Sequence, residues 1–160
     1  MIERRNGTYA AATYEDSTAN QLADWLNLHK IPNQIPTNKL HSTIIYSRTP
    51  IPTISHISMD AVELKDLGWR FVPDKLAMFT SSSGDKDVLV LTLKAPELVD
   101  MHENCLFSGA THDHETYEPH VTLSYDIPKD FDWLNIPVPS MYFVPSRIYF
   151  EPLNLNWKAE

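Results

Sequence analysis

Cysteine is almost absent from this chain, and no long apolar stretch occurs in it. The single cysteine, Cys105, excludes an internal disulfide and a zinc site built from several cysteines, which fits a reducing cytoplasm. Cys105 itself is best explained as a small apolar residue on a helix. No run of about 18 apolar residues occurs, and residues 1–6 are not followed by an apolar segment. We therefore expect a cytoplasmic protein with neither a membrane span nor a standard export signal.

Basic residues are also scarce. Lysine and arginine total 13 against 21 aspartates and glutamates, which leaves a net charge of −8, and the basic residues form no stripe. This pattern argues against a protein that grips long DNA or RNA. Binding of a small anionic ligand is not excluded, because it requires only a local region of positive charge. Two histidines with Lys39, Arg48 or Arg70 nearby could supply that spot.

The length and composition predict one folding unit. The chain has 160 residues, of which 42% are hydrophobic, and this is enough for a sizeable core. Low-complexity segments and interdomain linkers are absent from the sequence. We expect a single domain over residues 1–160, and nothing in the sequence indicates an obligate protein partner.

The most informative motif is a repeated His-x-Thr. It occurs at His41 and Thr43 and again at His120 and Thr122, both times in a His-x-Thr-x-x-Tyr frame within a strand-like stretch. Side chains alternate between the two faces of a strand, so each histidine and its threonine share one face. The same alternation places the intervening and following residues on the back: Leu40, Ser42, Ile44 and Tyr46 in the first copy, and Val121, Leu123 and Tyr125 in the second.

Two further matches to the pattern are less convincing. His56 precedes Ser58 after a proline-rich run, and His114 precedes Thr116 inside a polar stretch, and neither lies in a clear strand. The simplest alternative for the favoured pair is two partly buried histidines beside threonines that merely suit β-structure. Two copies in matching frames, one in each half of the chain, favour the functional interpretation.

The pattern along the chain alternates strands with two helices. Ser17 is a candidate N-cap for the first helix, which Pro32 ends, and Gly109 is a natural stop for the second, which has Pro96 in its first turn. The turn-rich residues 81–87 predict a hairpin between the strands on either side. Strands are expected over residues 7–14, 40–46, 76–80, 88–93, from 120 onward, 142–144 and 147–153, with mixed strand signals over 58–72 and helices over 18–30 and from 96 to 108.

This order predicts an α+β fold with largely antiparallel sheets. Each half carries one helix and one His-x-Thr strand, and we expect the helices outside and the two motif strands central, lining a cleft. Such a cleft would present two imidazoles and two hydroxyls to one ligand, an arrangement that suits a phosphodiester.

Two His-x-Thr motifs on strands, half a small domain apart, resemble the two-histidine phosphoesterase superfamily. The resemblance spans nearly the whole chain in element order and implies a bilobal fold in which both motifs line the central cleft. It implies that His41, Thr43, His120 and Thr122 form the catalytic phosphate site, and that no metal or other cofactor is needed.

Within that superfamily the chain is most similar to the phage anti-CBASS phosphodiesterases, which degrade cyclic di- and trinucleotide messengers of a bacterial antiviral system. The similarity lies in residues 6–9, the Tyr9 to His41 spacing, Trp69 after Gly68, and the tail over residues 149–157. It implies that Tyr9 and Trp69 contact a base, that Glu151 and Trp157 lie at the rim near the nucleotide, and that the protein acts in the host bacterial cytoplasm. The loop over residues 112–115 matches no motif of this family.

The residues support this chemistry by themselves. The ordinary pKa of histidine, about 6.5, allows one imidazole to be neutral and the other charged near neutrality, so that one accepts a proton while the other donates one. The threonine hydroxyls would donate to the non-bridging oxygens of the phosphate. Which histidine is the base and which the acid is not encoded in the motif.

Three alternatives remain open at this stage. The same fold could act on RNA 2′,3′-cyclic phosphates or RNA ends, although the acidic charge counts mildly against that substrate. A protein that sequesters nucleotides without cleaving them could use the same cleft. The residues His112 and His114, in the polar loop before the second motif, could bind a metal, but no further ligand pattern accompanies them.

Overall fold

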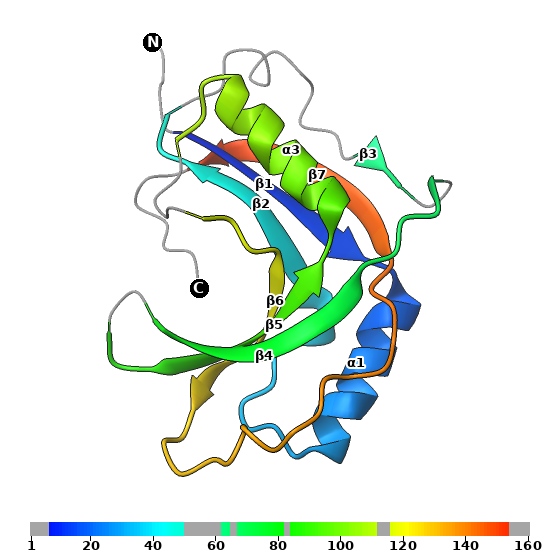
Figure 1. The fold of residues 1–160 in the computed structure, drawn as a ribbon, viewed down its shortest axis with the longest axis vertical. Coiled ribbons are helices and arrows are strands. Elements are labelled where there is room, and N and C mark those ends of the chain that lie inside the picture. The colour runs from blue at the N-terminus through cyan, green and yellow to red at the C-terminus, as the bar shows by residue number, and fades with distance from the viewer. Residues whose placement is uncertain (1–6, 50–61, 65–66, 82–83, 112–115, 154–160) are drawn as a thin grey trace.

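The computed structural model describes residues 7–49, 62–64, 67–81, 84–111 and 116–153 (Figure 1). Within these ranges the strands form two antiparallel sheets, one with the order β2-β1-β7-β3 and one with the order β4-β5-β6. The predicted α+β class with antiparallel sheets is confirmed. The elements are β1 (Gly7–Tyr14), α1 (Asp16–Leu28), the 3-10 turn η1 (Thr37–Lys39), β2 (His41–Ser47), β3 (Val62–Glu63), β4 (Val72–Thr80), β5 (Asp87–Lys94), α3 (Pro96–Phe107), β6 (His120–Ile127) and β7 (Pro145–Leu153).

The two motif strands lie at sheet edges, which differs from the sequence-based expectation. β2 is the outer strand of the four-stranded sheet and β6 is the outer strand of the three-stranded sheet. These two edges contact each other, so both strands are central in the molecule although neither is central in its own sheet. Alternation along a strand specifies which side chains share a face, but it does not specify the place of the strand within a sheet.

The helix α3 covers the sheet that carries the first motif. It contacts β2, although it comes from the second half of the chain (Figure 1). The predicted proline in the first turn is observed, and Gly109 has a φ of 108°, the left-handed conformation that glycine adopts most readily after a helix end. Cys105 is buried on this helix, as predicted. The two halves of the chain are therefore interleaved and do not each form a separate lobe.

The helix α1 begins earlier than predicted. It runs from Asp16 to Leu28, with Glu15 at the N-cap and no side-chain capping bond, so the expected cap at Ser17 is wrong. The backbone N–H of Glu15 donates instead to the carbonyl oxygen of Val144 at 2.9 Å, which anchors the start of the helix to a distant segment. Its apolar face points into the core, where Leu22 and Leu26 are both buried.

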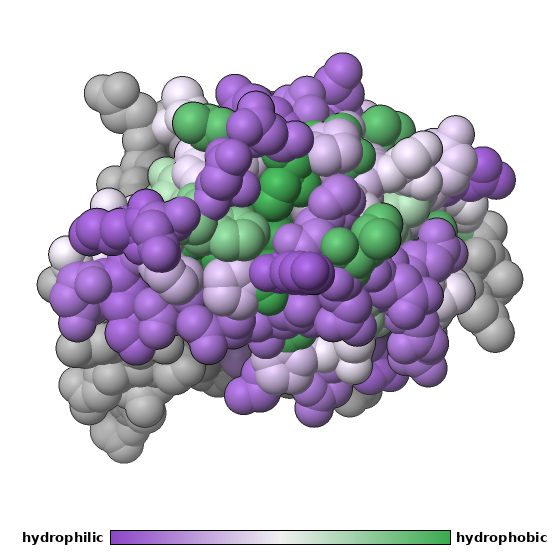
Figure 2. Space-filling model, turned by 90° about the horizontal axis from the view of Figure 1, so that it is seen from below, coloured by the Kyte–Doolittle hydropathy of each residue, from purple (hydrophilic) through white to green (hydrophobic). Residues whose placement is uncertain are grey.

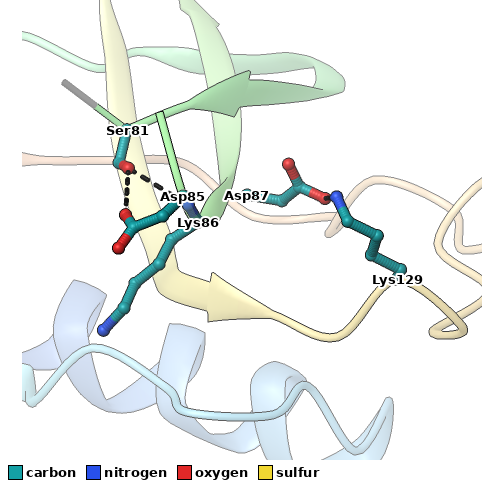
Figure 3. A network of polar contacts seen from close by, with 5 residues as sticks. All are labelled: Ser81, Asp85, Lys86, Asp87 and Lys129. Atoms are coloured by element: carbon teal, nitrogen blue, oxygen red, sulfur yellow. Dashed lines mark hydrogen bonds and ion pairs between the residues drawn. The ribbon is translucent and has the colours of Figure 1, made fainter. Parts of the chain in front are cut away.

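The hairpin between β4 and β5 is confirmed, and β4 starts four residues earlier than expected. The Ser81 side chain stabilises its turn by donating to the Asp85 carboxylate at 3.4 Å and accepting from the Lys86 N–H at 3.3 Å (Figure 3). At the end of the turn, Asp87 forms an ion pair with Lys129 at 3.3 Å. An exposed pair of this kind adds little stability, so the hairpin depends on its strand pairing.

The surface seen in Figure 2 is mostly hydrophilic. Hydrophobic residues on this face form a small central group bordered by hydrophilic residues, which is ordinary for a folded protein surface. Among the residues that the structure describes, no helix is long and apolar enough to cross a membrane.

Candidate active site

Each motif strand begins at its own histidine. His41 is the first residue of β2 and His120 is the first residue of β6, and both are half-buried, as are Thr43 and Thr122. The intervening residues, Ser42 and Val121, are fully buried. The predicted alternation over each tripeptide is therefore observed, with histidine and threonine on the partly exposed face.

A bulge follows the threonine in each motif strand. In β2 the residue Ile44 is skipped, because Thr43 lies opposite Ala11 and Ile45 lies opposite Ala10. In β6 the residue Leu123 is skipped in the same way, between two neighbouring partners on β5. An extra residue in one strand reverses the alternation beyond it.

The bulges overturn the predicted orientation of the two motif tyrosines. Tyr46 lies opposite Tyr9, and Thr43 lies opposite Ala11, so all four share one face of the sheet. The equivalent bulge places Tyr125 on the face of its own histidine and threonine. Both tyrosines therefore lie on the face of the motif histidine and threonine and not on the back of their strands.

The backbone at each bulge receives a donor from outside its sheet. In β2 the Tyr117 hydroxyl donates to the carbonyl oxygen of Thr43 at 2.7 Å, and the buried His102 donates from Nδ1 to the carbonyl oxygen of Ile44, also at 2.7 Å. The rings of His102 and Tyr117 stack, with centroids 4.1 Å apart and planes 7° apart. In β6 the Leu123 carbonyl accepts from the backbone N–H of Ile35 at 2.9 Å.

The contact between β2 and β6 brings the two motifs to one place. Tyr117, three residues before His120, reaches across to the carbonyl of Thr43. Tyr125 of the second motif lies near enough to Tyr9 to raise the pKa of that phenol slightly, after the much larger effect of burial. The strands that carry the two His-x-Thr motifs are thus neighbours in the structure, and the common site that they would line stays a prediction.

The two histidines are held in the same way. His41 Nδ1 lies 2.8 Å from the carbonyl oxygen of Lys39, and His120 Nδ1 lies 2.9 Å from the carbonyl oxygen of Glu118. A carbonyl oxygen only accepts, so Nδ1 carries a proton in both rings. In each neutral ring Nε2 is therefore the nitrogen that can accept a proton. The two histidines are equivalent in this respect.

Tyr9 is a buried residue at the edge of the candidate site. It is 3% exposed and packs against Tyr46 and Tyr149, and its contact with a base stays a prediction. Its hydroxyl lies 3.0 Å from the Thr43 hydroxyl. Burial raises the pKa of Tyr9 far above its ordinary range, and this keeps the hydroxyl protonated.

The three other residues for which the resemblance implies a nucleotide contact differ in burial and position. Glu151 is exposed and pairs with Tyr9 across β1 and β7, so it shares the face of Thr43, and its charge adds to burial in raising the pKa of Tyr149. Trp69 is half-buried and packs against the main core. Trp157 lies outside the described residues. The roles assigned to these three side chains stay predictions.

Sequence reasoning missed a further aromatic residue at the site. Phe79 of β4 makes an edge-to-face contact with His120, with centroids 5.6 Å apart and planes at 78°, and it is 40% exposed. Its strand was predicted, but its contact with a residue two strands away depends on the curvature of the sheet. The Arg48 guanidinium lies 5.8 Å from the ring centre of Tyr46, so this cation provides positive charge at the site.

One hollow of the surface lies away from the motif strands. It has a volume of about 820 Å³ and is lined by residues of α1, by the start of β4 and by residues 138–144. It contains none of the four motif residues and no histidine, so it offers no group for the proton transfers described above. Among the described residues no cluster of three metal-ligating side chains occurs, and the loop over residues 112–115 lies outside the described ranges.

Comparison with solved structures shows the kind of fold. The fold is similar to that of E. coli LigT in complex with 3′-AMP, with a TM-score of 0.57 and 16% identity over 92% of this chain and 87% of that one. LigT in complex with phosphate has the same TM-score, 14% identity, and coverage of 95% and 96%. Together with the paired His-x-Thr strands, this similarity defines a two-histidine phosphoesterase fold, as the sequence predicted.

Comparison with known sequences identifies the family. A family model described as "Anti-CBASS protein Acb1" matches residues 6–160. The protein of this name from Acinetobacter phage Ac42 is 38% identical over 155 residues, covering 95% of this chain and 94% of the relative. The one from Salmonella phage S16 is 35% identical over 157 residues, covering 97% and 93%. The chain belongs to the Acb1 family of anti-CBASS proteins.

Proposed function

We propose that this protein is a metal-independent phosphodiesterase that cleaves the 3′,5′-phosphodiester bonds of cyclic di- and trinucleotides to linear products. By removing these messengers it would block CBASS signalling in the cytoplasm of the host bacterium. The observation that carries the proposal is the equivalent geometry of His41 and His120, each held through Nδ1 at the start of one of two adjoining strands. Membership of the Acb1 family supports the choice of substrate.

The paired imidazoles suit a two-step cleavage. In the first step Nε2 of one histidine removes the proton from the ribose 2′-hydroxyl, and that oxygen attacks the neighbouring phosphorus. Nε2 of the other histidine gives its proton to the departing 5′-oxygen, which leaves a 2′,3′-cyclic phosphate. In the second step water enters by the reverse proton transfers and opens the ring to a 3′-phosphate.

The threonines stabilise the charge that builds on phosphorus. Thr43 and Thr122 lie on the same faces as His41 and His120, so their hydroxyls can donate to the non-bridging oxygens while the histidines act on the bridging ones. Arg48 near Tyr46 adds a positive charge that attracts the anionic substrate to a protein of net charge −8.

The decisive experiment is to incubate the purified protein with a panel of cyclic di- and trinucleotides and to separate the products by chromatography. We expect linear products that carry a 3′-phosphate, with the cyclic-phosphate intermediate visible early. A linear RNA ending in a 2′,3′-cyclic phosphate serves as the competing substrate. Faster turnover of that RNA than of every cyclic nucleotide would contradict the proposal, as would recovery of intact ligand after denaturation.

The same assay tests the metal-independent scheme. We expect full activity in the presence of EDTA, because the two histidines and two threonines supply every proton transfer and every donor that the reaction needs. Loss of activity in EDTA with recovery on adding a divalent metal would contradict this part of the proposal. The chelated sample should be assayed beside an untreated one from the same preparation.

A further inference from the structure

A positive charge lies just beyond the end of the first motif strand. Arg48 is the residue that follows β2, and its guanidinium carbon lies 5.8 Å from the ring centre of Tyr46. The bulge after Thr43 places Tyr46 on the face of that threonine. Because the guanidinium lies over this ring, its charge is on the face of the strand that carries the catalytic groups.

The backbone at Arg48 is fixed by side-chain hydrogen bonds and by close packing. Its N–H donates to Thr111 Oγ1 at 3.1 Å, and the N–H of Thr111 donates to Ser47 Oγ at 2.9 Å. The Ser47 hydroxyl in turn donates to the carbonyl oxygen of Thr49 at 2.6 Å. A Cβ on Gly7 would collide with the Ser47 carbonyl oxygen, so β1 packs closely against the same point. A side chain that starts from a fixed backbone loses less freedom when it binds a ligand.

The two motif strands differ at this position. Histidine, threonine and tyrosine recur at the same spacing in both, but the seventh residue after the histidine is Arg48 in the first copy and Ile127 in the second. Ile127 is buried, with 4% of its surface exposed. A group that the proton transfers required would be expected in both copies. Arg48 therefore serves a part of the ligand that only the first strand meets.

The strand order separates two opposite charges on this face of the sheet. Arg48 follows β2, the edge strand that contacts β6 and so adjoins the second motif. The exposed Glu151 lies on β7, two strands away from β2. An anionic group held close to the scissile phosphate is therefore attracted toward the end of β2 and repelled from β7.

The proposed substrates carry more phosphate than the histidines can use. A cyclic dinucleotide has two phosphodiester groups and a cyclic trinucleotide has three, and each cleavage event engages one of them. The remaining negative charge must be accommodated by a protein of net charge −8. The planar fork of arginine matches the oxygens of a phosphate, and a guanidinium that lies over an aromatic ring is held in place by it.

We propose that Arg48 is a specificity-determining residue that binds a non-scissile phosphate of the cyclic oligonucleotide. This inference rests on the proposed phosphodiesterase function. Through this contact Arg48 favours ligands with at least two phosphodiester groups over ligands with one.

The test compares a ligand that has a second phosphate with one that lacks it. The first is the best cyclic oligonucleotide, and the second is adenylyl-(3′,5′)-adenosine, a linear compound with the same scissile bond and a single phosphate. We expect Arg48→Gln to lower kcat/KM for the cyclic compound about tenfold, mainly through KM, because a charge-assisted hydrogen bond is lost. The kcat/KM for the linear compound should not change.

Arg70 provides a matched control. Its guanidinium carbon lies 5.3 Å from the ring centre of Tyr142, and both residues line the hollow away from the motif strands. Arg70→Gln removes the same charge from the same kind of pair, so it should leave both rates unchanged. Arg48→Lys keeps the charge without the planar fork and should recover only part of the tenfold loss. Urea unfolding establishes that each variant is folded.

Three results would overturn the proposal. An unchanged kcat/KM for the cyclic compound in Arg48→Gln means that Arg48 binds none of its phosphates. An equal loss for both compounds means that Arg48 acts at the scissile phosphate or on the fold. A loss of the same size in Arg70→Gln means that overall charge is responsible and not a contact.

The substrate proposal can fail separately. If the wild type cleaves the linear compound but no cyclic oligonucleotide, the proposed substrate is wrong. The inhibition constant of the cyclic compound against the linear one then tests Arg48 by the same comparison of variants. If the wild type cleaves only the cyclic compound, the inhibition constant of the linear one replaces its kcat/KM. If the wild type acts on neither compound, both proposals are overturned.

Discussion

At the scale of single residues, the site depends on which nitrogen of each histidine is occupied. Nδ1 of His41 and of His120 donates to a backbone carbonyl two residues earlier, so in each neutral ring Nε2 is the nitrogen that can accept a proton. The motif alone predicted that each histidine shares a face of its strand with its threonine, because alternation along a strand is a local property. It did not reveal the tautomer, because the accepting carbonyls depend on the backbone path before each strand.

This geometry predicts the effect of substitution by asparagine. The amide nitrogen of asparagine can take the place of Nδ1 and donate to the same carbonyl, but it provides no counterpart of Nε2. We expect His41→Asn and His120→Asn to fold normally and each to abolish turnover, as measured by product chromatography and urea unfolding. A folded double variant that still cleaves would remove the central claim of the mechanism.

The threonines should have smaller effects. Each supplies one donor to the developing charge, so Thr43→Ala and Thr122→Ala should each lower kcat roughly a hundredfold, the usual cost of one such donor. Steady-state kinetics with a cyclic dinucleotide measure this loss. A change in KM alone would show that the hydroxyl binds the substrate without favouring the transition state.

At the scale of elements, the bulges determine which side chains of each motif strand lie on the face of the candidate site. The extra residue after each threonine moves Tyr46 and Tyr125 onto the site face. In β2 the bulge is held from outside by the stacked pair of His102 on α3 and Tyr117 on the segment before β6. The position of Thr43 is thus coupled to the segment that leads into the second motif.

We expect Tyr117→Phe to weaken this element without disturbing the ring stack. It removes one donor from the partly buried carbonyl of Thr43, which costs about 0.5 to 1.5 kcal/mol of stability, and it should lower kcat by letting the bulge move. Urea unfolding and initial rates measure both effects. Tyr142→Phe, at a 54% exposed position, is the control, and a Tyr117→Phe variant that matches it in both measurements would contradict the coupling.

At the scale of the whole molecule, the core contains three tyrosine hydroxyls and one cysteine thiol that must stay protonated. Burial raises the pKa of Tyr9, Tyr14 and Tyr117 well above the ordinary value near 10 and raises the pKa of Cys105 to about 11. A folded-state pKa above the unfolded one favours the folded state at lower pH. That stability is fully present below the unfolded pKa values and is lost as the pH rises above them.

We therefore expect the urea midpoint to be constant up to about pH 8 and to fall between pH 9 and 11. The absorbance of ionised tyrosine should show that the three buried tyrosines titrate only as the protein unfolds. Cys105 should react slowly with a thiol reagent in the folded protein and quickly in urea. An unchanged midpoint at pH 10.5 would contradict the assigned burial of these groups.

The sequence by itself determined the α+β class and the shared face of each motif's histidine and threonine, because strand alternation, helix stops and turn chemistry are encoded over a few neighbouring positions. Only the tertiary structure decided that β2 and β6 are sheet edges in contact, that Tyr46 and Tyr125 face the site, and that Tyr9 reaches Thr43 through its hydroxyl. These facts depend on strand order and on single-residue bulges. Both are set by pairing between segments far apart in the chain, which no local pattern records.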